Sequence, residues 1–237
     1  MDTLTHIVLG ASIGEAMAGK ELGRKALLIG AVANSLPDID FVASLWLPVS
    51  TDLLAHRGFT HSILFMLLAS SLIASLCRRL FSSSGISFAR WGLFWALQIS
   101  VHLFIDCFNV YGTGIFEPFS HYRVSFNTLY VADPLFSVWP AIAAIILLVN
   151  RRKTASKFWA YFGLGCSTIY LMTAVFLKWR IDYTAQSETI RLQQHPVRYF
   201  TTPTPLNSLL WYVVSESDSG YNIGYRSVFD QSEHIAF

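Results

Sequence analysis

Charged residues are scarce in this sequence. Asp, Glu, Lys and Arg together make up 14% of its 237 residues, whereas a typical soluble domain has about 25%. Because 53% of the residues are hydrophobic, the composition excludes both an ordinary soluble globule and a disordered chain. The formal net charge of +2 is too small to indicate a nucleic-acid-binding groove, so no nucleic-acid partner is expected. The composition instead predicts an integral membrane protein.

Cysteine is also rare. The three cysteines lie inside apolar runs, form no C-x-x-C pair and cannot all pair with one another, so we interpret them as buried thiols. No basic segment precedes the first apolar stretch, which argues against a cleavable signal peptide. The membrane segments themselves would then direct the chain to the membrane.

Long runs without charge are abundant. About 20 helical residues cross the hydrocarbon core of a bilayer, and three uncharged runs approach or reach this length. A fourth run, Trp91–Val110, is equally apolar but carries Gln98, His102, Asp106 and Asn109. The three uncharged runs are Phe59–Cys77, Leu135–Val149 and Phe158–Leu177.

Two shorter helices are predicted near the N-terminus. Thr3–Ala18 carries Gly10, Gly14 and Ala18 at intervals of four, which is a small-residue face suited to close helix packing. Ala26–Leu36 stops before a proline, which cannot continue a helix. The fold class predicted for the whole chain is an all-α polytopic membrane protein with about four to six membrane helices and a small β-rich region at its C-terminal end.

Basic residues gather in alternate loops. Ten of the seventeen Lys and Arg residues lie in three loops, which the positive-inside rule places in the cytoplasm. The opposite loops hold only Arg57 and Arg123. Six spans would put both termini outside, and we expect a multi-pass protein of the bacterial inner (cytoplasmic) membrane. The ten basic residues are Lys20, Arg24, Lys25, Arg78, Arg79, Arg90, Arg151, Arg152, Lys153 and Lys157.

The C-terminal residues differ from the rest. Leu209–Val214 and Tyr221–Phe229 have the composition of strands and flank Asp218-Ser219-Gly220, which is a hairpin signal. We therefore divide the chain into a helical membrane domain, residues 1–177, and a small β-rich extracytoplasmic appendage, residues 178–237.

Polar side chains in four short segments stand out from these apolar surroundings. A charge at the centre of a membrane helix costs about 2.5–3.5 kcal/mol, so such residues are usually functional. His102 and Asp106 are four residues apart and share one helix face, and Asp38 and Asp40 would share a face of an extended segment. The predicted topology places all the candidate metal ligands on the outer side of the membrane. These candidates are His6, Asp38, Asp40, His56, His61, His102 and Asp106.

A mixture of imidazole and carboxylate ligands suits Zn²⁺ or another transition metal. Seven ligands exceed the needs of one tetrahedral ion, so one or two ions are expected, and two ions could share a carboxylate as in hydrolytic sites. His56 is either a ligand or a general base. Arg57 either holds an anionic group or anchors the chain at the membrane interface. We interpret His121, His195 and His234 as structural.

Several of these motifs together resemble the YdjM-like family of bacterial inner-membrane proteins, which are inferred to be metal-dependent hydrolases. The resemblance covers nearly the whole chain. It rests on Met1-Asp2-Thr3-Leu4-Thr5-His6, Leu36-Pro37-Asp38-Ile39-Asp40, His56-Arg57-Gly58-Phe59-Thr60-His61-Ser62, His102-xxx-Asp106-xxxx-Tyr111-Gly112-Thr113 and Pro203-Thr204-Pro205-Leu206-Asn207-Ser208-Leu209-Leu210-Trp211.

The order of the motifs is more distantly similar to zinc-dependent phospholipase C and zinc-dependent single-strand nucleases, which hydrolyse phosphate esters. His6, Asp38 or Asp40, His61 or His56, and the His102/Asp106 pair match that order. Two features depart from it. This chain starts with Met-Asp rather than with the tryptophan whose amine binds metal in those enzymes, and it lacks a later His-xxx-Glu or His-xxx-Asp pair.

These observations predict a membrane-bound, metal-dependent hydrolase with its site at the outer membrane interface. The resemblance implies hydrolysis of an ester, and the expected substrate is a lipid-linked or small phosphoester. Two alternatives remain open. His102 and Asp106 could form an ion or proton relay in a transporter, or the metal could be structural in a non-catalytic membrane scaffold.

Overall fold

The computed structural model describes residues 1–46, 48, 56–150, 155–191, 198–217, 220–231 and 234–235. Several residues used in the sequence analysis lie outside these described residues. They are the basic residues Arg151, Arg152 and Lys153, the hairpin residues Asp218 and Ser219, and His195.

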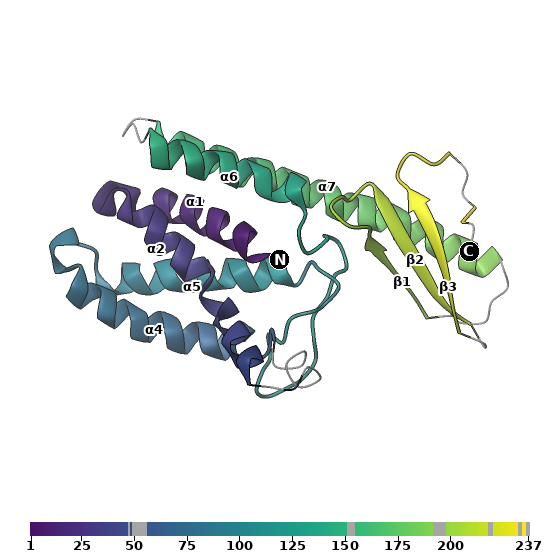
Figure 1. Ribbon diagram of the computed structural model, residues 1–237, viewed down its shortest axis with the longest axis horizontal. Helices are drawn as coiled ribbons and strands as arrows, with labels where there is room; N and C mark the ends of the chain where they lie inside the picture. The colour runs from purple at the N-terminus through teal and green to yellow at the C-terminus, as the bar shows by residue number, and fades with distance from the viewer. Residues whose placement is uncertain are drawn as a thin grey trace.

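Helices running along the long axis of the molecule form its larger part (Figure 1). Three of them, α4, α5 and the part of α7 up to residue 188, are long and apolar enough to cross a membrane, whereas α2 and α6 are shorter apolar helices. The number of spans therefore stays a prediction. The α-helices are α1 (Thr3–Leu22), α2 (Lys25–Asn34), α4 (Ile63–Leu80), α5 (Phe88–Asp106), α6 (Pro134–Val149) and α7 (Ser156–Arg191), and the 3₁₀ helices are η1 (Leu36–Leu45), η2 (Phe59–His61) and η3 (Ser82–Ser84).

Helix α1 packs against α2, α5, α6 and α7 and is largely buried. Its contact with α2 is very close, because glycines of the two helices face each other. A Cβ atom built on Gly30 would overlap the carbonyl oxygen of Gly10 and lie 2.8 Å from the Cα atom of Gly14. The small-residue face predicted for the first helix is thus confirmed, and it brings the C-terminal end of α2 against the N-terminal half of α1.

Hydroxyl and carboxylate side chains determine where the later helices begin. The Oγ atom of Ser62 accepts a hydrogen bond from the backbone N–H of Phe65 (3.0 Å) and caps α4. The uncharged run predicted from Phe59 therefore begins with a short 3₁₀ helix, and its α-helix starts only at Ile63. Asp133 caps α6 in the same way, because its side chain accepts a hydrogen bond from the backbone N–H of Leu135 (3.0 Å). This bond fixes the residue at which α6 begins.

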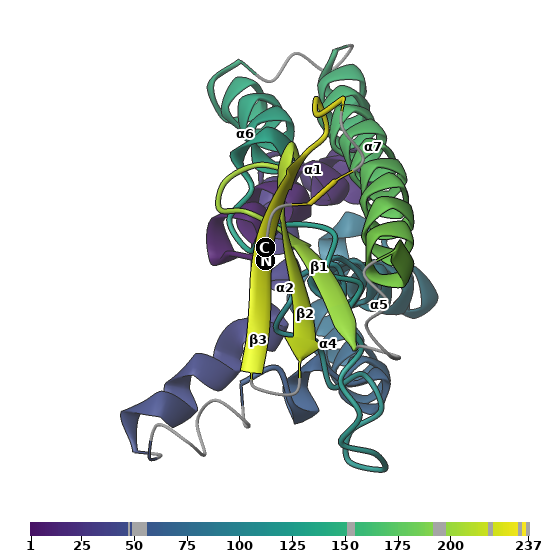
Figure 2. The ribbon, with the colours of Figure 1, turned by 90° about the vertical axis from the view of Figure 1, so that its right-hand side faces the viewer.

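The C-terminal strands form a three-stranded antiparallel sheet in the order β1 (Tyr199–Pro203), β2 (Leu210–Ser217) and β3 (Gly220–Ser227). The predicted hairpin is confirmed as β2 and β3. The sheet lies beside the C-terminal part of α7 (Figure 2). Trp211 and Val213 of β2 are fully buried with Ile181 and Ala185 of α7.

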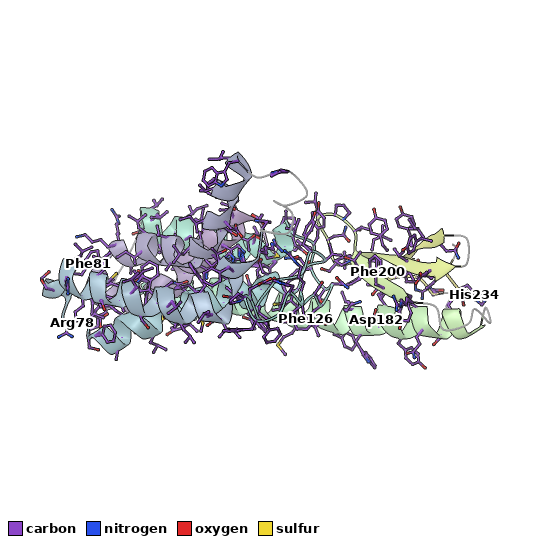
Figure 3. The ribbon with its side chains drawn as sticks, turned by 90° about the horizontal axis from the view of Figure 1, so that it is seen from below. Arg78, Phe81, Phe126, Asp182, Phe200 and His234 are labelled. Carbon is purple, nitrogen blue, oxygen red and sulfur yellow. The ribbon has the colours of Figure 1, made fainter. Side chains whose placement is uncertain are left out.

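Helix α7 is continuous across residue 177, where the sequence suggested a division of the chain. Its first part packs against α6 and its last turns carry the sheet. Figure 3 shows Arg78 at the opposite end of the molecule from Phe200 of the sheet and His234, with Phe126 between them. The sheet and the predicted cytoplasmic loop around Arg78 thus lie far apart along the long axis.

Replacing Trp211 tests whether the sheet depends on α7. The Trp211→Ala variant is expected to lose about 3–5 kcal/mol of the packing energy that holds the sheet, because the side chain is completely buried. Hydrogen exchange should rise in β1, β2 and β3 and stay unchanged in α5. Metal content should also stay at the wild-type level, and a loss of metal would show that the sheet and the helical part depend on one another.

Candidate metal centre

Four side chains converge at one end of the helical bundle. They are Asp38 from η1, His61 from η2, and His102 and Asp106 from the last turns of α5. One ligand atom from each lies within 4.8 Å of the others. The N-terminus of α1 and the C-terminal ends of α2 and α5 meet at this end of the bundle (Figure 1). The folding of three separate segments toward one point therefore assembles the cluster.

Five distances in this cluster are close to those of a tetrahedral metal site. Ligand atoms bound at 2.0–2.1 Å to one tetrahedral ion are about 3.3–3.4 Å apart. The Nε2 atom of His61 lies 3.0 Å from Nε2 of His102, 3.6 Å from Oδ1 of Asp38 and 3.5 Å from Oδ2 of Asp106. The His102 Nε2 atom lies 3.5 Å and 3.6 Å from the same two carboxylate oxygens. The ligand oxygens of Asp38 and Asp106 lie within 4.8 Å of each other, so the four groups are close enough to hold one metal ion.

The opposite nitrogens of both histidines have acceptors. The Nδ1 atom of His102 donates to the backbone carbonyl of Asn34 (2.6 Å). The Nδ1 atom of His61 lies 3.2 Å from Oδ2 of Asp40. An Nδ1–H group held in this way leaves Nε2 as the nitrogen that a metal can bind, which is the usual arrangement of histidines that bind a metal.

Charge in the cluster also favours a cation. Burial opposes the protonation of His61, yet hydrogen bonds to Asp106, Asp38 and Asp40 raise the pKa of its imidazole to about 10. Burial would raise the pKa of Asp40, but hydrogen bonds from His56 and His61 hold it well below its usual value. Oδ2 of Asp38 and Oδ2 of Asp106 are buried without a hydrogen-bond partner. These oxygens fit a positively charged ligand.

Asp38 and Asp40 do not share one face, contrary to the expectation for an extended segment. They lie in a 3₁₀ helix, in which each residue is rotated by about 120° from the one before it. Residues two apart therefore point in different directions. Asp38 therefore faces Nε2 of His61, whereas Asp40 faces the Nδ1 atoms of His61 and of His56 (3.1 Å).

His6 also reaches the cluster, from the opposite side of Asp106. Its Nε2 atom lies 3.1 Å from Oδ1 of Asp106, and its ring stacks on the ring of His102 with centroids 3.7 Å apart. The terminal amine of Met1 also contacts Oδ1 of Asp106. The two oxygens of Asp106 thus serve different neighbours, since Oδ2 faces His61 and His102.

Arg57 and His56 flank the cluster. Arg57 is buried and adopts a positive φ of 59°, which a non-glycine residue adopts only when its surroundings demand it. Its Nε atom lies 3.4 Å from Oδ2 of Asp106, and its Nη1 atom donates to Oδ1 of Asn109 (2.7 Å). His56 is 46% exposed at its side chain and lies farther out.

A cavity of about 1050 Å³ opens beside the cluster. Asp38 lines it, so the cavity reaches one of the four candidate ligands directly. One part of its wall carries His56, Arg57 and Arg123, and another carries apolar side chains of α2 and η1. These apolar side chains are Val32, Leu36, Ile39 and Phe41. The cavity therefore offers both cationic and apolar surface.

Asn34 and Asn109 were not among the residues selected from the sequence as site residues. The sequence places Asn109 only among the polar residues of Trp91–Val110 and predicts no role for Asn34. Both are fully buried and bind site residues. A signal for Asn34 was present in the sequence, because it is a polar residue in the otherwise apolar segment Ala26–Leu36.

Comparisons with known proteins find two relatives of this chain. An uncharacterized protein of Bacillus subtilis (strain 168), YfhP, is 32% identical over 145 residues, which are 58% of this chain and 43% of the relative. The inner membrane protein YbcI of Escherichia coli (strain K12) is 28% identical over 153 residues, or 64% of this chain and 80% of the relative. The chain thus spans less than half of YfhP. No solved structure matches.

The family described as YdjM inner membrane protein matches residues 1–181. The match includes every helix up to the middle of α7 and all the residues of the candidate metal centre. Together with the helices that can cross a membrane, it identifies an inner membrane protein. The chain belongs to the YdjM inner membrane protein family.

Proposed function

We propose that this protein is a membrane-bound, metal-dependent hydrolase that cleaves a phosphoester bond of a lipid-linked substrate at the outer membrane interface. The supporting observation is the tetrahedral set of His and Asp ligand atoms beside a cavity with cationic and apolar walls. Zn²⁺ is the metal proposed, because two imidazoles and two carboxylates are ligands that it accepts readily. One or two ions are proposed, and the described residues contain one group of four His and Asp ligands.

Each site residue has a proposed role. Asp38, His61, His102 and Asp106 hold the ion, which when bound supplies an acidified water and polarises a phosphoryl oxygen. Asp40 orients His61 through its Nδ1 atom. Asn109 fixes the guanidinium of Arg57, which is placed to hold an anionic oxygen. His56, at the cavity wall, is the candidate general base.

The walls of the cavity support a lipid-linked substrate. Val32, Ile39 and Phe41 line the cavity and are 62%, 53% and 63% exposed. Leu28, one turn before Val32 on α2, is equally exposed, so this apolar surface continues along the outside of α2. An acyl chain could lie along it while a phosphate meets Arg57 and Arg123.

A structural metal is the second candidate function. Four protein ligands are typical of structural zinc sites, whereas catalytic sites usually keep one position open. The cavity beside Asp38 favours catalysis, because an open space next to a ligand would give water and substrate access to the ion. A scaffold protein would need the ion only for stability.

Hydrolysis should be measured on protein purified in detergent. Phosphatidic acid, a phosphodiester lipid and a water-soluble bis-aryl phosphate serve as substrates, each before metal removal, after chelation and after addition of Zn²⁺ or Mn²⁺. We expect stoichiometric metal and lipid hydrolysis that chelation removes and metal restores. Bound metal without hydrolysis of any substrate would favour the scaffold. No bound metal would favour an ion or proton relay through His102 and Asp106.

A further inference from the structure

Asn34 lies at the junction of three helices behind the metal centre. It is the last residue of α2, is fully buried, and contacts His6 of α1 and Gln98 and His102 of α5. We propose that Asn34 is the positioning residue of the metal centre, which orients His102 through its backbone and His6 through its side chain. The inference rests on the metal centre of the proposed function.

The backbone of Asn34 is available because of its place in the helix. The last carbonyl groups of an α-helix have no partner within the helix. The carbonyl of Asn34 accepts from Nδ1 of His102 at 2.6 Å. A carbonyl can only accept, so this nitrogen carries the proton and Nε2 keeps its lone pair toward His61, Asp38 and Asp106. The negative end of the α2 dipole adds to the strength of this bond.

The side chain of Asn34 is held in one orientation. Its Nδ2 atom donates to the backbone carbonyl of Gln98 (2.8 Å) and to Oε1 of Gln98 (3.2 Å). The Nε2 atom of Gln98 in turn donates to the carbonyl of Gly10 (3.0 Å). If either side-chain amide were flipped, its NH₂ group would no longer donate these hydrogen bonds. Oδ1 of Asn34 therefore stays directed at Nδ1 of His6 (3.2 Å).

One residue therefore binds the Nδ1 atoms of two imidazoles and fixes the orientation of both rings. With Nδ1 of each ring bound to Asn34, both Nε2 atoms are presented to Asp106, at 3.1 Å for His6 and 3.6 Å for His102. The two rings stack with an angle of 25° between their planes, which matches rings held from the same side. Partners of metal-binding histidines of this kind commonly change metal affinity when they are lost.

Substitutions at Asn34 test this role by metal affinity rather than by hydrolysis. Asn34→Leu has a similar volume and cannot accept from His6, so its affinity for Zn²⁺, measured by competition with a chelator, should fall about 10–100-fold. Asn34→Asp keeps an acceptor for His6 and should lose less. Asn34→Ala removes the same contacts as Asn34→Leu without introducing a branched side chain. It replaces the leucine variant in the affinity measurement if that variant does not fold.

Two further measurements separate positioning from general stability. The absorption spectrum of Co²⁺-substituted protein should change in Asn34→Leu and Asn34→Ala, because the ring of His6, which stacks on His102 and contacts Asp106, is no longer held by the Asn34 side chain. Ser167→Ala is the control, since it removes a buried hydrogen bond to the carbonyl of Phe136 (2.7 Å) away from the cluster and should keep both affinity and spectrum.

The outcomes are distinct. Wild-type affinity and spectrum in a folded Asn34→Leu or Asn34→Ala protein would overturn the inference while leaving the metal centre intact. Equal losses in Asn34→Asp and Asn34→Leu would also overturn it, because the acceptor for His6 would then be irrelevant. A wild-type protein that binds neither Zn²⁺ nor Co²⁺ would instead overturn the proposed function, on which the inference depends.

Discussion

Asp106→Asn protein is expected to retain less than about a tenth of the bound metal, because a neutral amide replaces the carboxylate at the centre of the cluster. The Oδ2 atom of Asp106 lies 3.5 Å and 3.6 Å from Nε2 of His61 and of His102. Its Oδ1 atom lies beside His6. The variant removes the negative charge from all of these contacts at once. Elemental mass spectrometry of detergent-purified protein measures the result, and His102→Ala should give the same loss.

Asp133→Asn provides the matched control. Asp133 is also fully buried, and burial raises the pKa of its carboxyl group. It caps α6 and accepts from Tyr170 (2.8 Å), outside the metal cluster. Asparagine is as good an N-cap as aspartate, so this variant should fold and keep its metal. Equal metal loss in both variants would mean that loss of any buried carboxylate disturbs the fold, and the assignment of Asp106 as a ligand would not stand.

Gly30→Ala should have the second largest effect. The added methyl group would overlap the carbonyl oxygen of Gly10 and lie 3.0 Å from Nε2 of Gln98. Because backbone atoms cannot move aside as a flexible side chain can, α1 and α2 must separate, at a cost of about 1–3 kcal/mol or more. The separation moves His6 away from Asn34, so metal binding should fall together with thermal stability, as followed by metal content and by the unfolding temperature in detergent.

A second glycine shows whether this effect is specific. Gly165 lies within α7, and a Cβ atom built there has no neighbour within 4 Å. Gly165→Ala should therefore keep both the metal and the unfolding temperature, or raise the latter slightly through the better helix propensity of alanine. If Gly30→Ala behaves in the same way, the close contact of α1 and α2 does not hold the metal centre together.

The sequence was informative wherever a local pattern determines the structure. The spacing of His102 and Asp106 placed both on one face of α5, and the small residues of α1 predicted its close contact with α2. The C-terminal hairpin also followed from local turn and strand signals. The length of the uncharged run does not predict where α4 begins. The helix begins after its cap Ser62 and not at Phe59, the first residue of the run.

Contacts between distant segments could not be obtained in this way. Asp38 and Asp40 look equivalent as candidate ligands in the sequence, and only the 3₁₀ turn of η1 directs Asp38 to the cluster and Asp40 to the far side of His61. The role of Asn34 depends on two partners that are 28 and 68 residues away. Such pairings depend on how the helices pack against one another. The local patterns of a single sequence do not determine that packing.

The length of α7 has a consequence for the sheet. A helix of 36 residues extends about 54 Å, whereas the hydrocarbon core is about 30 Å thick. The helix is therefore longer than one crossing requires, and the buried side chains of Trp211 and Val213 pack the sheet against its C-terminal part. A membrane helix adjusts to bilayer thickness by tilting, and elements packed on a continuous helix move with it. A change in the tilt of α7 would therefore move the sheet with it.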